Sequence, residues 1–141
     1  MTQLINTIIM EYHISLVRAK IQDKYYTESK VRGFTVFSDE PESIGGTNRA
    51  PNPLDLMNSS LAACTLMYLL NKASVEKMDV GTIKIKIKVA KNEGGNFKFK
   101  RVLYFENELS INHKEKLLNY ANNSPVTRAL KGCNEITTII K

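Results

Sequence analysis

A single cysteine in the middle of a long apolar segment is the side chain with the clearest capacity for chemistry. Cys64 follows Ser60-Leu61-Ala62-Ala63, in a stretch whose spacing predicts a helix. A thiolate is a strong nucleophile, but a cysteine on an apolar helix is most often inert packing. The glycine pair Gly45-Gly46 and the entry Pro51-Asn52-Pro53 lie shortly before it and favour a reactive site. The helix pattern alone leaves both interpretations open.

The bulk composition excludes several classes of protein. The chain has 141 residues, which suits a single domain over residues 1–141. It has two cysteines, too few for a disulfide scaffold, so a reducing cytoplasm is expected. The histidines, His13 and His113, are far apart, which predicts no metal site, and no cofactor is expected. The chain contains no run of about 18 apolar residues and its start does not resemble a signal peptide, so no membrane association is expected.

The formal net charge of +6 comes with a regular pattern of lysines. Lysine alternates with apolar residues over 83–89 and again over 96–101, the period of a strand with one buried and one solvated face. Lysines on an open sheet face usually serve solubility and edge protection. Because no nucleic-acid motif accompanies the charge, no nucleic-acid partner is expected.

A long helix is predicted from Pro53 to about Lys77. Asn52 is a favourable N-cap, proline suits the first helical position, and Asp55 lies in the first turn, where it complements the helix dipole. Two apolar stripes run along the helix, which indicates a central helix covered on most sides. The first comprises Leu54, Met57, Leu61, Cys64 and Tyr68, and the second Leu56, Ala63, Met67 and Leu70.

The remaining pattern predicts an α+β fold. Strands are expected over about 11–22, 24–30 and 31–37, before a loop over 38–52, and a hairpin over 80–91 and 96–109 turns at Glu93-Gly94-Gly95. Asn112 and Ser124 are predicted to cap two further helices, the second with Pro125 in its first turn and Gly132 at its end. A closing strand is expected over 135–140.

A set of short motifs resembles the OsmC/Ohr-like proteins, from about Val17 to the C-terminus. The motifs are Arg32-Gly33-Phe34, Ser38-Asp39-Glu40-Pro41, Gly45-Gly46, Pro51-Asn52-Pro53-Leu54-Asp55-Leu56, Leu61-Ala62-Ala63-Cys64 and Ser124-Pro125-Val126-Thr127-Arg128-Ala129-Leu130. The resemblance implies an intertwined homodimer, in which antiparallel sheets from both subunits wrap two long central helices. It also implies thiol-dependent reduction of organic hydroperoxides.

The resemblance assigns the peroxidatic position to Cys64. A thiolate in the middle of an apolar helix needs a nearby cation, because the helix dipole fades beyond the first turn. Arg32 is the first choice for that cation, with Arg18 and Arg49 as alternatives. Asp55 lies near the family's acidic residue but is shifted by one, since Leu54 occupies that position. On its own helix it lies opposite Cys64, so it would act across the dimer or simply cap the helix.

The main departure from the family is Ser124, which stands where the resolving cysteine is expected and cannot form a disulfide. Cys133 is a possible substitute, and an external thiol could instead reduce a sulfenic acid at Cys64. Ser60, one turn before Cys64, could donate to a thiolate or simply allow close packing. Two functions follow: a one-cysteine peroxidase of organic hydroperoxides, or a non-enzymatic protein that binds a small apolar ligand in the dimer cavity.

Overall fold

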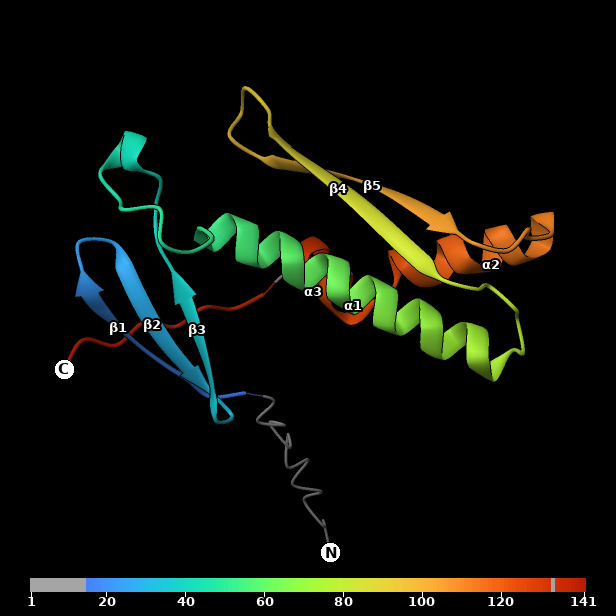
Figure 1. Cartoon of the computed structure of the whole chain (residues 1–141), viewed down its shortest axis with the longest axis horizontal. Coiled ribbons are helices and arrows are strands. Elements are labelled where there is room, and N and C mark those ends of the chain that lie inside the picture. The colour runs from blue at the N-terminus through green and yellow to red at the C-terminus, as the bar shows by residue number, and fades with distance from the viewer. Residues whose placement is uncertain (1–14, 133) are drawn as a thin grey trace, which may run out of the picture. The chain divides into compact units, whose positions relative to one another are not determined.

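The computed structural model describes residues 15–132 and 134–141, and the chain divides into two compact units with the boundary between Pro53 and Leu54. The N-terminal unit is a three-stranded antiparallel sheet. The C-terminal unit combines a long helix, a two-stranded antiparallel hairpin and two shorter helices (Figure 1). The predicted α+β class is therefore confirmed.

The N-terminal sheet has the order β1-β2-β3, with β1 at Val17–Asp23, β2 at Tyr26–Val31 and β3 at Phe34–Ser38. All three strands were predicted, although residues 11–14 of the first lie outside the described part of the chain. The β2–β3 turn consists of Arg32 and Gly33, whose φ angles are +47° and +85°. Two consecutive positive φ angles are typical of a tight two-residue hairpin turn.

No apolar side chain of residues 15–53 is buried. Large apolar side chains on β1 and β3 are instead exposed: Val17, Ile21, Phe34, Val36 and Phe37. A small antiparallel sheet is stable when one of its faces packs on other elements. The N-terminal sheet therefore has no hydrophobic core of its own.

The loop after β3 includes the short 3-10 helix η1 (Glu42–Ile44) and is organised around one buried carboxylate. Asp39 is 1% exposed and accepts hydrogen bonds from the backbone N–H groups of Glu40, Thr47 and Arg49 and from the Thr47 hydroxyl. One short side chain thus satisfies several donors of the loop. Its position in the Ser38-Asp39-Glu40-Pro41 motif has a structural explanation.

Acid is expected to loosen this loop. Burial raises the pKa of Asp39, but the hydrogen bonds from Thr47, Arg49 and Glu40 outweigh that effect and hold it at about 2, below its ordinary value of 3.8. A carboxylate with a lowered folded-state pKa stabilises the fold above pH 3.8, and this contribution is lost as the pH falls through about 2. Amide exchange at Thr47 and Arg49 should accelerate in that window. In Asp39→Asn the exchange should be fast already at neutral pH, and an unchanged slow rate there would contradict the assignment.

Gly46 packs directly against the backbone of the same loop. A Cβ atom at this position would lie 1.8 Å from the Glu40 carbonyl oxygen, far inside contact distance. Gly46→Ala is therefore expected to displace the loop and lower the free energy of unfolding by about 1–3 kcal/mol. Gly94→Ala is the control, because its Cβ would meet nothing closer than 3.5 Å. Urea unfolding measures both, and equal stabilities would contradict the clash.

The long helix α1 spans Pro53–Val75 and buries one face, formed by Leu61, Thr65, Leu69 and Ala73. It ends two residues earlier than predicted because Lys77 takes a left-handed conformation, with φ +55°. Met78 N–H then donates to the Ala73 carbonyl, and Lys77 N–H to that of Ser74. This arrangement is the Schellman motif that commonly terminates helices.

The buried face of α1 differs from both predicted apolar stripes, because it shares only Leu61 with the first and no residue with the second. Leu69 and Ala73 pack with Met78, Val80, Leu109, Leu117 and Ala121 in a buried cluster. Met67 and Leu70, from the second stripe, are 71% and 59% exposed. One face of α1 thus remains uncovered in the single chain.

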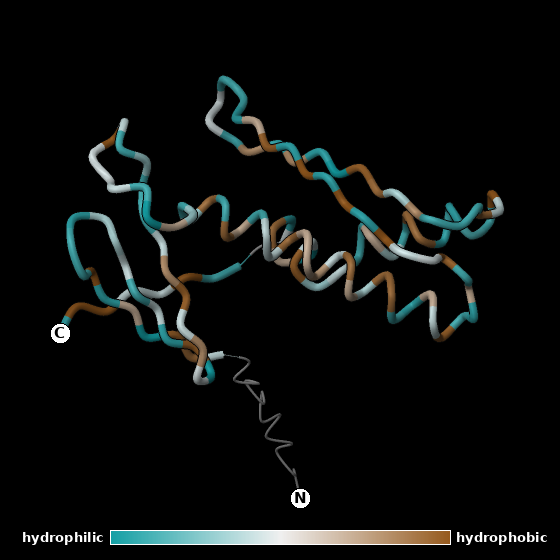
Figure 2. The backbone as a smooth tube through the Cα atoms, in the orientation of Figure 1, coloured by the Kyte–Doolittle hydropathy of each residue, from teal (hydrophilic) through white to brown (hydrophobic). Residues whose placement is uncertain are grey.

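The hairpin consists of β4 (Ile83–Lys91) and β5 (Phe97–Phe105), and its predicted alternation is confirmed. The isoleucines of β4 are half-buried while the lysines between them are exposed. Figure 2 shows the same alternation of hydrophobic and hydrophilic residues along both strands. Both strands are shorter than predicted, because Val80 and Leu109 belong to the core outside the ladder.

The helices α2 (Ile111–Asn122) and α3 (Pro125–Lys131) are present. Two predictions for this part of the chain are wrong: the cap of α2 and the closing strand after α3. Ser110, rather than Asn112, caps α2, since its hydroxyl accepts a hydrogen bond from His113 N–H. Residues 135–140 are exposed and form no strand. Their β-branched sequence favours extended backbone, but a strand exists only where a neighbouring strand pairs with it.

Candidate functional site

Cys64 lies on α1 beside the first turn of α3. Its Sγ accepts a hydrogen bond from Val126 N–H at 3.5 Å, and the side chain is half-buried. The thiol opens into a shallow groove of about 450 Å³, lined by Ser60, Ala63, Met67, Tyr68, Asn71 and Pro125 as well as Cys64. A molecule in this groove would meet a thiol and mostly apolar walls.

Ser124 lies in the same turn as Val126, two residues earlier, and is completely buried. Its hydroxyl is 2.7 Å from the Thr127 hydroxyl. It occupies the N-cap position of α3, as predicted, but its side chain makes no capping hydrogen bond with the helix backbone. The predicted capping role of the side chain is therefore wrong, because the Ser124 hydroxyl pairs with the Thr127 hydroxyl instead of a backbone N–H of α3.

Behind this turn, one arginine joins four elements. Arg101 on β5 donates from Nη1 to the Thr65 hydroxyl on α1 at 3.0 Å and to the Thr127 hydroxyl on α3 at 2.9 Å. The same nitrogen contacts the Ala121 carbonyl at 3.0 Å, and Nη2 donates to Asn122 Oδ1 at 3.2 Å, both on α2. Thr65 is the neighbour of Cys64 in the chain, and Thr127 follows Val126. Arg101 thus ties together the two segments that meet at the thiol.

The charge of Arg101 has no counterion within the described chain. None of the ion pairs between described residues includes it. Partial burial lowers the pKa of Arg101, although the group remains cationic at neutral pH. A partly buried charge without a carboxylate is unusual, because desolvation is normally offset by pairing.

Arg101, Thr65 and Thr127 were not predicted as site residues. The sequence does contain a signal for Arg101. Because side chains alternate between the two faces of a strand, Arg101 lies on the same half-buried face of β5 as Phe99, Leu103 and Phe105. A charged residue on the otherwise apolar face of a strand indicates that polar partners lie on that side of the sheet. The identity of those partners depends on the tertiary fold, since Thr65 is 36 residues away in the chain.

The three arginines considered from the sequence all lie in the N-terminal unit. Arg32 is exposed in the β2–β3 turn, and Arg18 is exposed on β1. Arg49 is engaged locally: its Nη2 is 2.9 Å from Asp23 Oδ2, and its guanidinium lies 4.1 Å above the Tyr26 ring. Its contacts hold the loop against the sheet, so a structural role explains Arg49 by itself.

The other predicted site residues have separate positions. Asp55 lies in the first turn of α1, as predicted for a residue that complements the helix dipole. Ser60 lines the groove with Cys64. Cys133 lies outside the described residues. Among described residues, no cluster of His, Cys, Asp and Glu could hold a metal ion.

No helix in the described part of the chain is long and apolar enough to cross a membrane.

The fold is α+β, and its cysteine lies in the middle of the long helix against the first turn of a short one. These features place the chain in the class of small α+β proteins with a thiol on a long helix. Residues 46–139 match the family described as OsmC-like protein, and the chain belongs to that family. The resemblance found in the sequence motifs is thereby confirmed. No curated protein matches the chain by sequence.

Several solved structures share the fold. A proposed osmotic stress induced and detoxification response protein from Psychrobacter arcticus aligns with 80% of this chain and 85% of its own, at 20% identity and a TM-score of 0.71. The organic hydroperoxide resistance protein OsmC from Legionella pneumophila aligns over 86% and 91%, at 21% identity and a TM-score of 0.63. A proposed organic hydroperoxide resistance protein from Vibrio cholerae, with captopril in one of its active sites, aligns over 87% and 89%, at 20% identity and a TM-score of 0.60. At these identities the likeness establishes the fold.

Proposed function

We propose that this protein is a thiol peroxidase that reduces organic hydroperoxides through Cys64, in oxidative-stress defence. The observation that carries the proposal is the Cys64 Sγ itself, which opens into a groove and accepts the Val126 N–H at 3.5 Å. A reactive cysteine needs access and groups that favour the thiolate. The apolar groove walls, such as Met67 and Tyr68, suit hydroperoxides with hydrocarbon substituents.

The proposed reaction begins with attack of the Cys64 thiolate on the terminal oxygen of the hydroperoxide. The S–O bond forms as the O–O bond breaks, leaving a sulfenic acid on Cys64 and an alkoxide that takes up a proton to become the alcohol. Arg32 is proposed as the cation that supports the thiolate and Asp55 as an acidic auxiliary, both on the strength of the family motifs. Ser60 is proposed as a further donor at the groove.

The return to the thiol is proposed to use an external thiol. Ser124 carries a hydroxyl and cannot form a disulfide. One small thiol would condense with the sulfenic acid, releasing water and forming a mixed disulfide, and a second would release Cys64 as the thiol with a new external disulfide. A reducing cytoplasm would supply such thiols.

A direct test is to react the reduced protein with one equivalent of cumene hydroperoxide and trap sulfenic acid with dimedone. Mass spectrometry should find the adduct on Cys64 within the first turnover and little on Cys133. Hydrogen peroxide at equal concentration should react more slowly, because it gains nothing from the apolar groove. An unmodified Cys64 would reject the peroxidase.

Ser124→Cys is expected to restore an internal disulfide cycle. The turn that carries Ser124 also carries Val126, whose N–H contacts Cys64, so a thiol at position 124 would lie in the same turn. After one equivalent of hydroperoxide, the variant should lose both thiols at 64 and 124 and yield a linked peptide pair by mass spectrometry. Thr127→Cys is the comparison. A persistent sulfenic acid in Ser124→Cys would show that position 124 is not the resolving position.

The second candidate is a non-enzymatic protein that binds a small apolar ligand. It is favoured by the complete burial of Ser124 and its bond to Thr127, a packed arrangement without redox capacity. Alkylation with iodoacetamide separates the two candidates. A peroxidase predicts that Cys64 reacts at least about tenfold faster than Cys133 at neutral pH, whereas a binding protein predicts equal or slower reaction.

We further propose that the active form is an intertwined homodimer with both units of the chain in one domain. The support is the uncovered apolar surface: the sheet β1-β2-β3 buries no apolar side chain, and Met67 on α1 is 71% exposed. A second copy would cover such surfaces by apolar burial. Light scattering should give twice the mass of the 141-residue chain, and a monomer at micromolar concentration would reject the proposal.

A further inference from the structure

A second pocket is lined in part by Arg101 and Thr127 and does not include Cys64. It has a volume of about 320 Å³ and shares no lining residue with the groove at Cys64. The volume falls in the range of small-molecule sites, about 300–1,000 Å³. Nothing in the proposed peroxidase reaction uses this pocket.

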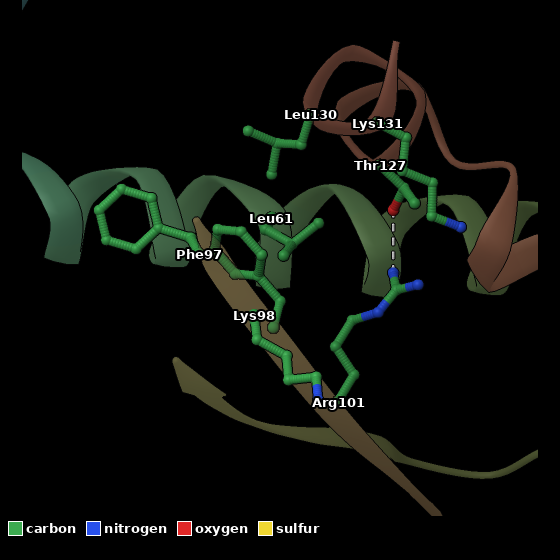
Figure 3. Close-up of a pocket in the computed structure, with 8 residues that line it drawn as sticks. Leu61, Phe97, Lys98, Arg101, Thr127, Leu130 and Lys131 are labelled. Carbon is green, nitrogen blue, oxygen red and sulfur yellow. Dashed lines mark hydrogen bonds between the residues drawn. The ribbon is translucent and has the colours of Figure 1, made fainter. Parts of the chain in front are cut away.

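The pocket has an apolar part and a cationic part. Leu61 on α1, Phe97 on β5 and Leu130 on α3 form the apolar walls. Lys98, Arg101 and Lys131 supply three positive charges, and no acidic residue lines the pocket. Figure 3 shows Phe97 and Leu61 on one side and the Arg101 guanidinium, bonded to Thr127, on the other.

Some N–H groups of the Arg101 guanidinium make no hydrogen bond with the described residues. Its hydrogen bonds within the described chain use Nη1 and one contact of Nη2, and none uses Nε. A guanidinium carries five N–H donors in one plane and binds carboxylates through two of them at once. The positive charge also lacks a counterion among described residues. An anionic ligand would supply both the acceptor and the charge.

We propose that this pocket binds an amphipathic monocarboxylate, with its carboxylate on Arg101 and its hydrocarbon tail against Leu61, Phe97 and Leu130. Lys98 and Lys131 add attraction at the rim. A larger hollow of about 770 Å³ is also lined by Lys98, Arg101 and Lys131, and again by no acidic residue. The site thus selects both negative charge and apolar bulk, which a neutral lipid or a small inorganic anion offers only in part.

The test uses decanoate as the probe and isothermal titration calorimetry on the full chain. Decanoate should bind, while 1-decanol and acetate should each bind at least about tenfold more weakly, since the first lacks the charge and the second the tail. Equal affinity for 1-decanol would overturn the ionic part of the proposal, and absence of decanoate binding would overturn all of it.

Variants locate the site without relying on Arg101, whose loss can affect folding. Lys98→Gln combined with Lys131→Gln should weaken decanoate binding several-fold. Lys84→Gln combined with Lys86→Gln is the matched control, because it removes the same charge from the exposed face of β4. Equal weakening in both double variants would mean a net-charge effect and reject the pocket. Arg101→Lys should lose more affinity than either, with folding verified by circular dichroism.

The proposal is independent of the peroxidase. Cys64→Ser should bind decanoate with unchanged affinity, because no lining residue is shared. A loss of binding in Cys64→Ser would place the carboxylate in the thiol groove and overturn the second site.

Discussion

Cys64→Ser is expected to abolish hydroperoxide reduction, with a loss of at least about a thousandfold in the rate of the first step. The hydroxyl of serine is not ionised at neutral pH and is a poor nucleophile toward a peroxide oxygen. The oxidised intermediate of the proposed cycle, a sulfenic acid, requires sulfur. Stopped-flow consumption of cumene hydroperoxide with excess dithiothreitol measures the effect.

Cys133→Ser is the matched variant for this experiment. Ser124 is no thiol, so the one-cysteine cycle predicts a rate near that of the unmodified protein in Cys133→Ser. Equal losses in the two variants would reject the one-cysteine cycle and assign the resolving role to Cys133. An unchanged rate in Cys64→Ser would reject the peroxidatic role of Cys64 altogether.

Arg101→Met is expected to lower the free energy of unfolding by about 2–4 kcal/mol. Methionine retains much of the side-chain stem but removes the hydrogen bonds to Thr65, Thr127 and the end of α2. Hydrogen bonds from a charged donor are worth about 1.5–3 kcal/mol each. Part of that is offset because the desolvated charge disappears as well. Urea unfolding measures the difference.

The same variant should release α3 from α1 more than it loosens the rest of the unit. Hydrogen exchange should accelerate in residues 125–131, and Cys64 should lose its Val126 contact and change its alkylation rate. Arg101→Lys retains the charge and one of the bonds, so an intermediate stability is expected. Lys86→Met is the control, because it removes one positive charge from the exposed face of β4. A stability of Arg101→Met equal to that of the unmodified protein would contradict the clamp.

The sequence by itself determined the elements whose signals are local. The alternation of lysine and isoleucine over 83–89 has period two and becomes β4, because successive side chains of a strand point to opposite faces. Pro53 begins α1, as the backbone preference of proline favours, and Gly132 follows α3. The motif set also identified the family, and the placement of Cys64 on the long helix follows from the same pattern.

Only the tertiary structure decided which residues meet. The contact of Val126 N–H with Cys64 joins residues 62 apart in the chain, and the Arg101 bond to Thr65 joins residues 36 apart. Such pairs depend on how α3 and β5 pack on α1, which no local pattern encodes. The same reason explains the error at residues 135–140: their sequence favours extended backbone, but a strand needs a neighbour, and pairing is decided between distant segments. Local patterns therefore determined most of the helices and strands, and packing decided which segments pair and which side chains form the site.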